Sequence, residues 1–235
     1  MTRRRWIADE LLGNRAALTG DHARHLANVL RAQVGQEFDI SSGVEVRRGK
    51  VLSVHPDRVE FELGEGIARP EQAQITVAIS IFKFDRMEWA IEKCTELGVM
   101  RIVPVIAGRT EKHLASAAAK RVDRWRRLVH QAAEQSRRSS SPKIAEPINI
   151  KELFAVSGET KIVLSEVEQE TMFKDAIPHG ASSALLAFGP EGGWTQQELA
   201  AFREAGWTSA SLGNTILRVE TAVIAAVAVA LSVFH

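Results

Sequence analysis

The chain has 235 residues but only one cysteine, Cys94, and almost no net charge. A disulfide within the chain is excluded because it needs two thiols. The lack of a cysteine pair fits a reducing compartment such as the cytoplasm. The formal net charge of +1 at pH 7 points to no class of partner. Any affinity for a polyanion must therefore come from local basic patches.

Long apolar segments are also lacking. The longest apolar run, AVIAAVAVALSVF at residues 222–234, is too short for a helix to cross a bilayer core of about 30 Å. We expect it to form a buried or interface helix. The N-terminal segment MTRRRWIADELL carries positive charge without a following apolar run, so it does not have the pattern of a secretory signal. These features predict a cytoplasmic protein without a membrane segment.

Residues 1–70 have the pattern of a small β-barrel or sandwich. Short alternating segments, EFDIS, VEVRRGKVLSV and RVEFELGEG, are separated by Ser-Gly, His-Pro-Asp and Gly-Glu-Gly turns. One helix, GDHARHLANVLRA, interrupts them, with Asp21 as its expected N-cap. The polar segment EGIARPEQAQ contains Pro70 and predicts a boundary, with a second domain at residues 71–235.

From Ile75 onward, strands and helices alternate. The predicted strands are ITVAISIF, RIVPVIA, KIVLSE, SSALLAF and TSASLG, and the predicted helices are DRMEWAIEKCTELG, SAAAKRVDRWRRLVHQAAEQS, TQQELAAFREAG and VETAVIAAVAVALSVF. The first helix is expected to be capped by Asp85 at its start and by Gly98 at its end. This alternation predicts an α/β domain with a mostly parallel sheet covered by helices on both faces. Ligands bind such sheets beyond the carboxyl ends of the strands.

Two turns lie at such strand ends. The first is GPEGG at residues 189–193, between a predicted strand and a predicted helix. Glycine lets a ligand approach the backbone, and a helix N-terminus presents free N–H groups, so this turn could cradle a carboxylate, a phosphate or an adenine edge. A tight structural turn is the alternative. Neither the dinucleotide-binding fingerprint nor the P-loop pattern is present.

The second turn, LGNTILRVETA at residues 212–222, contains two charged residues in an apolar setting. Arg218 and Glu220 lie where a strand end meets a nearly all-apolar helix. Buried charges need partners or a chemical role. The pair therefore either acts on a ligand or forms a salt bridge at the start of the helix, where the dipole favours Glu220.

Together the two turns resemble the paired C-terminal motifs of the SPOUT methyltransferases, and within them the ribosomal RNA small subunit methyltransferase E family. Three more segments are similar to family segments: HARHLANVLRAQVGQEF at 22–38, KFDRMEWAIEKCTELGVMRIVPVIAGRT at 83–110 and AAEQSRRSSSPKI at 132–144. The resemblance covers nearly the whole chain. The chain departs from it at Asn214 and Thr215, where the family often has Pro-Arg, and at Arg137, where it often has Gly.

The resemblance implies an N-terminal PUA-like β-barrel at 1–70 and a SPOUT α/β domain with a deep trefoil knot at 71–235, in a homodimer. It implies that S-adenosylmethionine methylates N3 of a uridine in 16S rRNA of the small ribosomal subunit, at the family's target position 1498. The last helix also favours a homodimer, because it is apolar almost all round, more than packing on one sheet requires. Burial of this helix within one chain is the alternative.

The resemblance also implies where the methyl donor binds. In the family, the adenosyl pocket is lined by a strand end, the GPEGG loop and the LGxxILR loop. The matching residues here are Leu164, Ser165, Phe188, Gly189, Pro190, Glu191, Gly192, Gly193, Leu212, Gly213, Asn214, Ile216, Leu217 and Arg218. Arg218 is the candidate for positioning the uracil or a phosphate and for stabilising charge. Because N3 must lose its proton, Glu220 is the candidate base, or else the structural partner of Arg218.

Basic residues predict two RNA-contacting patches. Residues 120–138 hold seven basic residues and two acidic ones, a local excess of five positive charges, although a solvated helix face is the alternative. The candidates are Arg121, Arg124, Arg137 and Arg138 in this patch, and Arg3, Arg4, Arg5, Arg24 and Arg31 in the N-terminal domain. Because the chain has no tyrosine, Trp6 is the best-placed residue for stacking on a base.

The sequence predicts no metal site. His22 and His25 lie close together, but no cysteine or acidic residue accompanies them at ligand spacing, so we expect them at the surface or facing RNA. Two other functions stay open. One is a ribosome-associated RNA-binding protein that keeps the pocket without catalysis, and the other is a SPOUT enzyme that methylates a ribose 2′-hydroxyl in tRNA. The N-terminal barrel motif argues against the tRNA enzyme.

Overall fold

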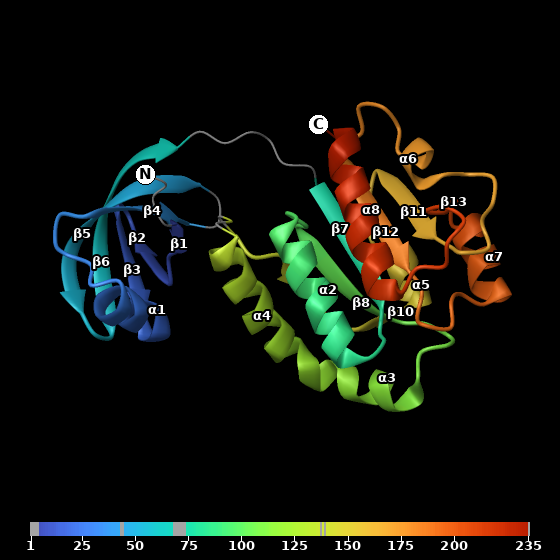
Figure 1. Ribbon diagram of the computed structural model, residues 1–235, viewed down its shortest axis with the longest axis horizontal. Coiled ribbons are helices and arrows are strands. Elements are labelled where there is room, and N and C mark those ends of the chain that lie inside the picture. The colour runs from blue at the N-terminus through green and yellow to red at the C-terminus, as the bar shows by residue number, and fades with distance from the viewer. Residues whose placement is uncertain (1–4, 43–44, 68–73, 137, 139, 235) are drawn as a thin grey trace. The chain divides into compact units, whose positions relative to one another are not determined.

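The structure is a computed structural model, and it describes residues 5–42, 45–67, 74–136, 138 and 140–234. The chain divides into two compact units (Figure 1). The first contains Met1–Glu71 and Ala133–Ser141, and the second contains Gln72–Ala132 and Pro142–His235. Each unit buries its own hydrophobic residues. The sequence carried no signal that Ala133–Ser141 would group with the first unit.

The first unit is a curled, mostly antiparallel sheet. Its strand order is β1-β4-β5-β6-β3-β2, in which β1 and β4 are parallel and the other neighbours are antiparallel. The elements are β1 (Arg5–Ile7), β2 (Glu10–Leu12), β3 (Arg15–Thr19), α1 (Gly20–Arg24), a π-helical turn (His25–Val29), β4 (Glu37–Ser41), β5 (Val46–His55) and β6 (Arg58–Ile67). This architecture confirms the predicted small β-barrel class.

The helical segment of this unit differs from its prediction. The α-helical part ends at Arg24 and continues as a π-helical turn, and Thr19, not Asp21, occupies the N-cap position. Asp21 instead lies in the first turn, where its negative charge complements the helix dipole. Leu26 of the π-helical turn is fully buried, so the whole segment covers the core of the curled sheet.

His22 is held between two carboxylates of the first unit. Its Nδ1 lies 3.0 Å from Asp9 Oδ1, and its Nε2 lies 3.2 Å from Glu134 Oε1. Hydrogen bonds to Asp9 and then to Glu134 raise the pKa of His22 to about 10. The imidazole is therefore charged at neutral pH and links the barrel to the segment Ala133–Ser141. This structural role replaces the surface or RNA-facing role that the sequence suggested.

The second unit is built on a sheet in which every pairing of the described residues is parallel. The strand order is β10-β8-β7-β12-β11-β13, and β9 pairs with β8. The strands are β7 (Gln74–Ser80), β8 (Arg101–Ile106), β9 (Lys143–Ile144), β10 (Ile148–Asn149), β11 (Thr160–Leu164), β12 (Ser183–Phe188) and β13 (Thr208–Ala210). The parallel α/β class is confirmed. The trefoil knot stays a prediction, because strand order alone does not specify how the chain threads.

Helices cover both faces of this sheet (Figure 1). They are α2 (Phe84–Glu96), α3 (Lys112–Ala118), α4 (Val122–Gln135), α5 (Ile150–Phe154), α6 (Phe173–Ala176), α7 (Gln196–Glu204) and α8 (Val219–Phe234). Side chains of α2, α4 and α8 fill the core on one face, and those of α5 and α7 fill the other. Among the described residues, no helix is both long and apolar enough to span a bilayer.

Two predictions about the helices need correction, and four short elements were not predicted. The long helix predicted after residue 115 is divided by a 3₁₀ turn at Ala119–Arg121. The helix α2 begins at Phe84, so Lys83 rather than Asp85 is at its N-cap. The short elements β9, β10, α5 and α6 were not predicted, because each is too brief to show a hydrophobic period.

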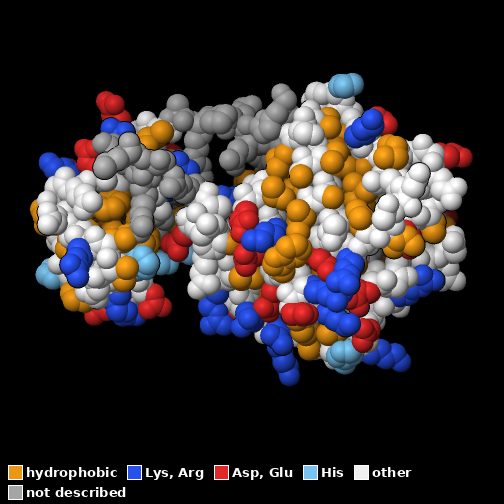
Figure 2. All heavy atoms as spheres, viewed as in Figure 1, with side chains coloured by type: hydrophobic (Ala, Val, Ile, Leu, Met, Phe, Trp, Pro, Cys, Tyr) orange, Lys and Arg blue, Asp and Glu red, His pale blue; other side chains and the backbone are white. Residues whose placement is uncertain are grey.

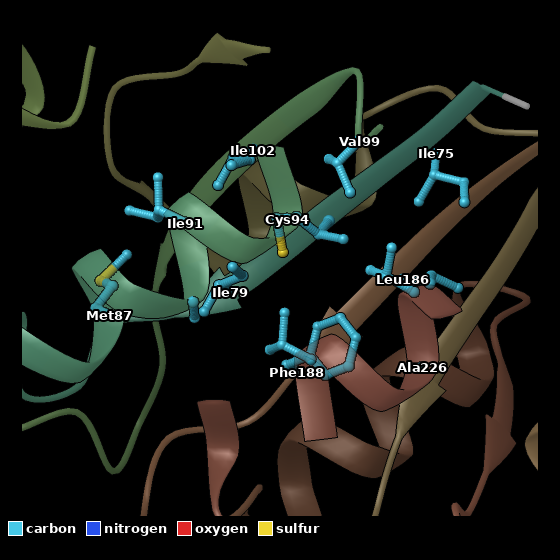
Figure 3. Close-up of a cluster of buried hydrophobic side chains, with 14 of the residues drawn as sticks. Ile75, Ile79, Met87, Ile91, Cys94, Val99, Ile102, Leu186, Phe188 and Ala226 are labelled. Atoms are coloured by element: carbon cyan, nitrogen blue, oxygen red, sulfur yellow. The ribbon is translucent and has the colours of Figure 1, made fainter. Parts of the chain in front are cut away.

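The core between α2, α8 and the sheet explains the single cysteine. Figure 3 shows Cys94 of α2 beside Ile79 of β7, with Leu186 of β12 and Ala226 of α8 nearby. All four are fully buried. Burial raises the pKa of the Cys94 thiol to about 12, so the side chain behaves as a small apolar residue and not as a nucleophile.

Candidate functional site

A cavity of about 930 Å³ opens at the carboxyl ends of β11, β12 and β13. Its walls are the end of β11, the loop 189–193 that follows β12, and the loop 212–218 that precedes α8. The volume is within the range of small-molecule sites. The strand β12 lies between β7 and β11. From β7 the chain continues to β8 on one side of this position, and from β12 it continues to β13 on the other side. Ligands bind α/β folds where the strand order reverses in this way.

The cavity brings together every residue that the sequence assigned to the adenosyl pocket, and Glu220 as well. It also has lining residues that the sequence did not single out: Arg86, Glu166, Glu168, Gln169, Ser211, Val219 and Ala222. Most of these follow a strand or precede a helix at the same edge of the sheet. The rule that ligands bind beyond strand ends could have found them, had it been applied to β7 and β13 as well.

The glycine loop is shaped by two different constraints. Gly193 has a φ of +68°, a conformation that L side chains rarely adopt, and a Cβ at this position would overlap the Glu166 carboxylate. A Cβ on Gly189 would instead come within 3.3 Å of the Trp194 indole. A side chain at Gly193 would therefore meet the Glu166 carboxylate in the cavity wall, whereas a side chain at Gly189 would press on the Trp194 indole within the protein.

The residues that follow the loop fix its position. The indole Nε1 of Trp194 donates a hydrogen bond to the Leu164 carbonyl at 3.0 Å, and its ring packs edge-on against Phe202. The helix α7 begins with a capping box between Thr195 and Glu198, in which each side chain accepts a backbone N–H of the other. The loop therefore connects a strand end to a well-capped helix over an aromatic core.

An arginine that the sequence did not single out contacts the same loop. Arg109 Nη1 donates a hydrogen bond to the Gly192 carbonyl at 2.6 Å. The neighbouring Gly108 N–H donates to Glu198 Oε1 at 2.6 Å, so the segment after β8 is attached to the start of α7. These contacts orient the loop backbone without occupying the cavity.

Glu220 has a different partner from the one considered in the sequence. Its nearest cation is Arg86, whose Nε lies 3.8 Å from Glu220 Oε1. The residue is 7% exposed, and its other oxygen, Oε2, is buried without a hydrogen-bond partner. The guanidinium of Arg218 is exposed and forms no hydrogen bond or ion pair with the described residues. The Arg218–Glu220 salt bridge is therefore wrong as an alternative, and both residues line the cavity.

Two further carboxylates in the cavity wall follow β11. Hydrogen bonds from the backbone amides of Glu170 at 2.9 Å and Thr171 at 3.3 Å hold the pKa of Glu168 below its usual range, so this carboxylate stabilises its own loop. Glu166 is exposed and forms no hydrogen bond or ion pair with the described residues. Its carboxylate faces the cavity beside Gly193.

Comparison with known proteins assigns the chain to a family. The model of the RNA methyltransferase domain family matches residues 69–231, and that of the RNA methyltransferase PUA domain matches residues 18–64. The chain is 31% identical over 220 residues to the Bacillus subtilis ribosomal RNA small subunit methyltransferase E, covering 88% of this chain and 85% of the relative. This chain belongs to the ribosomal RNA small subunit methyltransferase E family. The resemblance carried by the two C-terminal turns is thereby confirmed.

Solved structures show the same fold. A ribosomal RNA small subunit methyltransferase E from Neisseria gonorrhoeae, bound to S-adenosyl methionine, is 32% identical, with a TM-score of 0.84 over 97% of this chain and 96% of that chain. A methyltransferase from Legionella pneumophila, in complex with the bound cofactor SAM, is 25% identical, with a TM-score of 0.82 and 97% of each chain covered.

The arginines predicted to contact RNA lie in different settings. Arg3, Arg4 and Arg137 are outside the described residues. Arg138 is buried, with 8% of its surface exposed, which is the opposite of the exposure that a phosphate contact requires. Arg5 is half-buried in β1, and this leaves fewer accessible charges than the sequence suggested.

Several exposed candidates already have acidic partners. Arg24 pairs with Asp21 and with Asp57, the latter at 2.7 Å. Arg124 makes two hydrogen bonds to Glu88, at 2.8 and 2.9 Å. Arg121 lies 3.7 Å from Glu88, and its guanidinium stacks 4.7 Å from the centre of the Phe84 ring. These pairings reduce the net positive charge that the candidates present to a polyanion.

Other basic residues are better placed. Lys120 and Arg127 are exposed and form no ion pair with the described residues, and Arg31 is exposed with a φ of 50°. Figure 2 shows Lys and Arg side chains along the edge of the second unit where α3 and α4 run. The sequence could not single out Lys120 and Arg127, because only the fold shows which arginines of a basic helix meet an acidic neighbour.

Proposed function

We propose that this protein transfers a methyl group from S-adenosylmethionine to N3 of a uridine in 16S rRNA of the small ribosomal subunit. Membership of the ribosomal RNA small subunit methyltransferase E family supports the substrate class. The observation that carries the proposal is the cavity between the loops 189–193 and 212–218. In its wall lie the Arg218 guanidinium and one Glu220 oxygen, neither of which has a partner among the described residues.

The cavity fits the methyl donor in size and chemistry. Leu164, Phe188 and Leu217 offer apolar surface to an adenine ring, and the loop 189–193 offers backbone groups at the edge of that surface. The Glu166 carboxylate, on the cavity side of Gly193, is an acceptor for hydroxyl or ammonium groups. When bound, S-adenosylmethionine supplies a methyl carbon that is electrophilic because it is attached to a sulfonium.

Arg218 and Glu220 have complementary roles in this proposal. Uridine N3 holds a proton at neutral pH, and it becomes a nucleophile only as that proton leaves. The Glu220 carboxylate is the acceptor for the N3 proton. The Arg218 guanidinium stabilises the negative charge that then develops on the uracil carbonyl oxygens. Both residues are held at one wall by the start of α8, so a base entering the cavity meets the two together.

The decisive experiment uses small ribosomal subunits from a strain that lacks this methyl group. The protein and S-adenosylmethionine are added, and the RNA is digested and analysed by mass spectrometry. One added methyl on a uracil ring, together with a reverse-transcription stop because N3 can no longer pair, is the expected result. A methyl on a tRNA ribose, or donor binding without any transfer, would replace the proposal with one of the two alternatives.

We further propose that two copies pair through α8. One side of this helix packs on the core through Val223 and Ala230, while Ala228 on its other side is exposed. Figure 2 shows hydrophobic side chains over the outer surface of this region. Light scattering at micromolar concentration should give twice the chain mass, and Ala228→Arg should give a monomer because it buries a charge at the contact.

The matched control is Ala200→Arg on the exposed side of α7, which should leave the dimer intact. A monomeric wild-type protein at that concentration would exclude pairing through α8.

RNA binding should depend on salt through the exposed basic residues that form no ion pair within the described part of the chain. The double substitution Lys120→Ala and Arg127→Ala should reduce the slope of log affinity against log salt by up to about two phosphate contacts. The affinity is measured by fluorescence anisotropy. The control variant, Lys151→Ala with Arg203→Ala, also removes two positive charges but on the opposite face of the sheet, and it should leave the slope unchanged. Identical slopes for the two double variants would mean that α4 does not face RNA.

A further inference from the structure

The side chain of Arg86 lies between two carboxylates that belong to different walls of the cavity. Arg86 is in the first turn of α2, directly after β7, and it lines the cavity itself. Its Nη1 donates a hydrogen bond to Glu191 Oε1 at 3.3 Å, and its Nε lies 3.8 Å from Glu220 Oε1. One guanidinium therefore connects the glycine loop to the start of α8.

The two carboxylates depend on this cation to different degrees. Glu191 is about one-third exposed, so water also solvates it, whereas the side chain of Glu220 is only 9% exposed. A buried carboxylate without a cation nearby carries a large desolvation cost. Because Arg218 forms no ion pair with Glu220 among the described residues, Arg86 is the cation that the structure provides for it.

The geometry leaves one oxygen of Glu220 unused. Arg86 faces Oε1, and Oε2 is buried without a hydrogen-bond partner. A buried acceptor without a donor is destabilising unless a bound group supplies the donor. The contact with Arg86 thus engages one oxygen of Glu220 and leaves the other unpaired among the described residues, at a residue that lines the cavity.

Neighbouring charges do not compete for Arg86. Glu88, two residues further along α2, is bound by Arg124 and lies near Arg121. On the other side of the glycine loop, Arg109 contacts the Gly192 carbonyl and no carboxylate of the cavity. The two arginine side chains therefore hold the loop in different ways. Arg109 binds the loop backbone at the Gly192 carbonyl, and Arg86 binds the Glu191 side chain.

We propose that Arg86 is a positioning residue that sets the glycine loop and Glu220 in their working arrangement. It acts on donor affinity through Glu191 and on the transfer rate through Glu220. The second part rests on the proposed function, since it takes Glu220 as the proton acceptor. Without Arg86, two carboxylates at the cavity wall lose their shared counterion, so the loop and the start of α8 are pushed apart.

The first test measures donor affinity by calorimetry without RNA, in a double-mutant cycle of Arg86→Gln and Glu191→Gln. Arg86→Gln should weaken S-adenosylmethionine binding by about tenfold in the wild-type background, and by less than about threefold when Glu191 is already Gln. Arg86→Lys should recover part of the affinity, because an ammonium keeps the charge but cannot bridge two carboxylates as a guanidinium does. The control Arg203→Gln, on the exposed surface of α7, should change nothing.

A second cycle, Arg86→Gln with Glu220→Gln, measures kcat at saturating donor. Arg86→Gln should lower kcat by about tenfold alone and much less when Glu220 is already Gln. Additive effects in both cycles, or a fall in melting temperature with unchanged affinity and kcat, would overturn the positioning role. If the wild-type protein binds the donor but methylates no small-subunit RNA, the proposed function fails while the first cycle still decides whether Arg86 positions the loop.

Discussion

Replacing Arg218 with alanine should lower the methylation rate by about 10²- to 10³-fold while the affinity for S-adenosylmethionine stays nearly unchanged. The guanidinium lines the cavity and is exposed, and no described carboxylate pairs with it. No described group neutralises its charge. In the proposed reaction, charge builds on the uracil only as N3 loses its proton, so removal of the cation should reduce kcat much more than it changes donor binding.

Three measurements separate the possible roles of Arg218. Donor affinity by calorimetry, kcat on small subunits and melting temperature are compared for Arg218→Ala and Arg218→Lys. Lysine should restore part of kcat, since it supplies charge without the two-pronged geometry. Loss of donor binding in Arg218→Ala would place the residue in the donor site instead. Full activity in Arg218→Ala would remove the support for a catalytic role.

Replacing Gly193 with valine should weaken S-adenosylmethionine binding by about 100-fold or more, on the order of 2.7 kcal/mol. Two effects combine at this position. A β-branched residue is strained at a φ of +68°, and its Cβ would overlap the Glu166 carboxylate that faces the cavity. The substitution therefore moves Glu166 and narrows the cavity at the same point.

Gly206→Val is the matched control for this substitution. Gly206 has a similar φ of +77°, but no heavy atom lies within 4 Å of its Cβ position, and it does not line the cavity. Both variants should lose comparable thermal stability from backbone strain, while only Gly193→Val should lose donor affinity. Equal losses of affinity, or a loss in Gly193→Val that simply follows its melting temperature, would show that the glycine loop is a structural turn only.

Much of the second unit follows from local patterns in the sequence. The helix predicted at residues 219–234 has the same bounds as α8, because its apolar composition and the charged start at Glu220 are local signals. The turn at 189–193 was expected beyond a strand end, and it is there that the cavity opens. The N-cap of α1 was mistaken, because Thr19 and Asp21 are both good cap residues and local sequence does not choose between them.

The partners of charged side chains were not predictable in this way. The sequence offered the nearby Arg218 as one possible partner of Glu220, whereas the fold places Glu220 beside Arg86. The burial of Arg138 reverses an expectation based on a run of basic residues. His22 joins Asp9 and Glu134, which are far apart in the chain. Each result depends on which helices, strands and loops lie next to each other in the fold. The distance between two residues along the sequence does not predict whether they are neighbours in the fold.

The sequence by itself determined the family, the parallel α/β class of the second unit and the two loops that form the cavity. It could do so because hydrophobic periods, glycine turns and motif order are properties of short segments. Only the tertiary structure decided that Arg86 joins the two loops and that Glu166 faces Gly193. Those contacts span only a few ångströms. They form because the crossover connections of a parallel sheet bring the carboxyl ends of its strands, which are far apart in the sequence, to one edge.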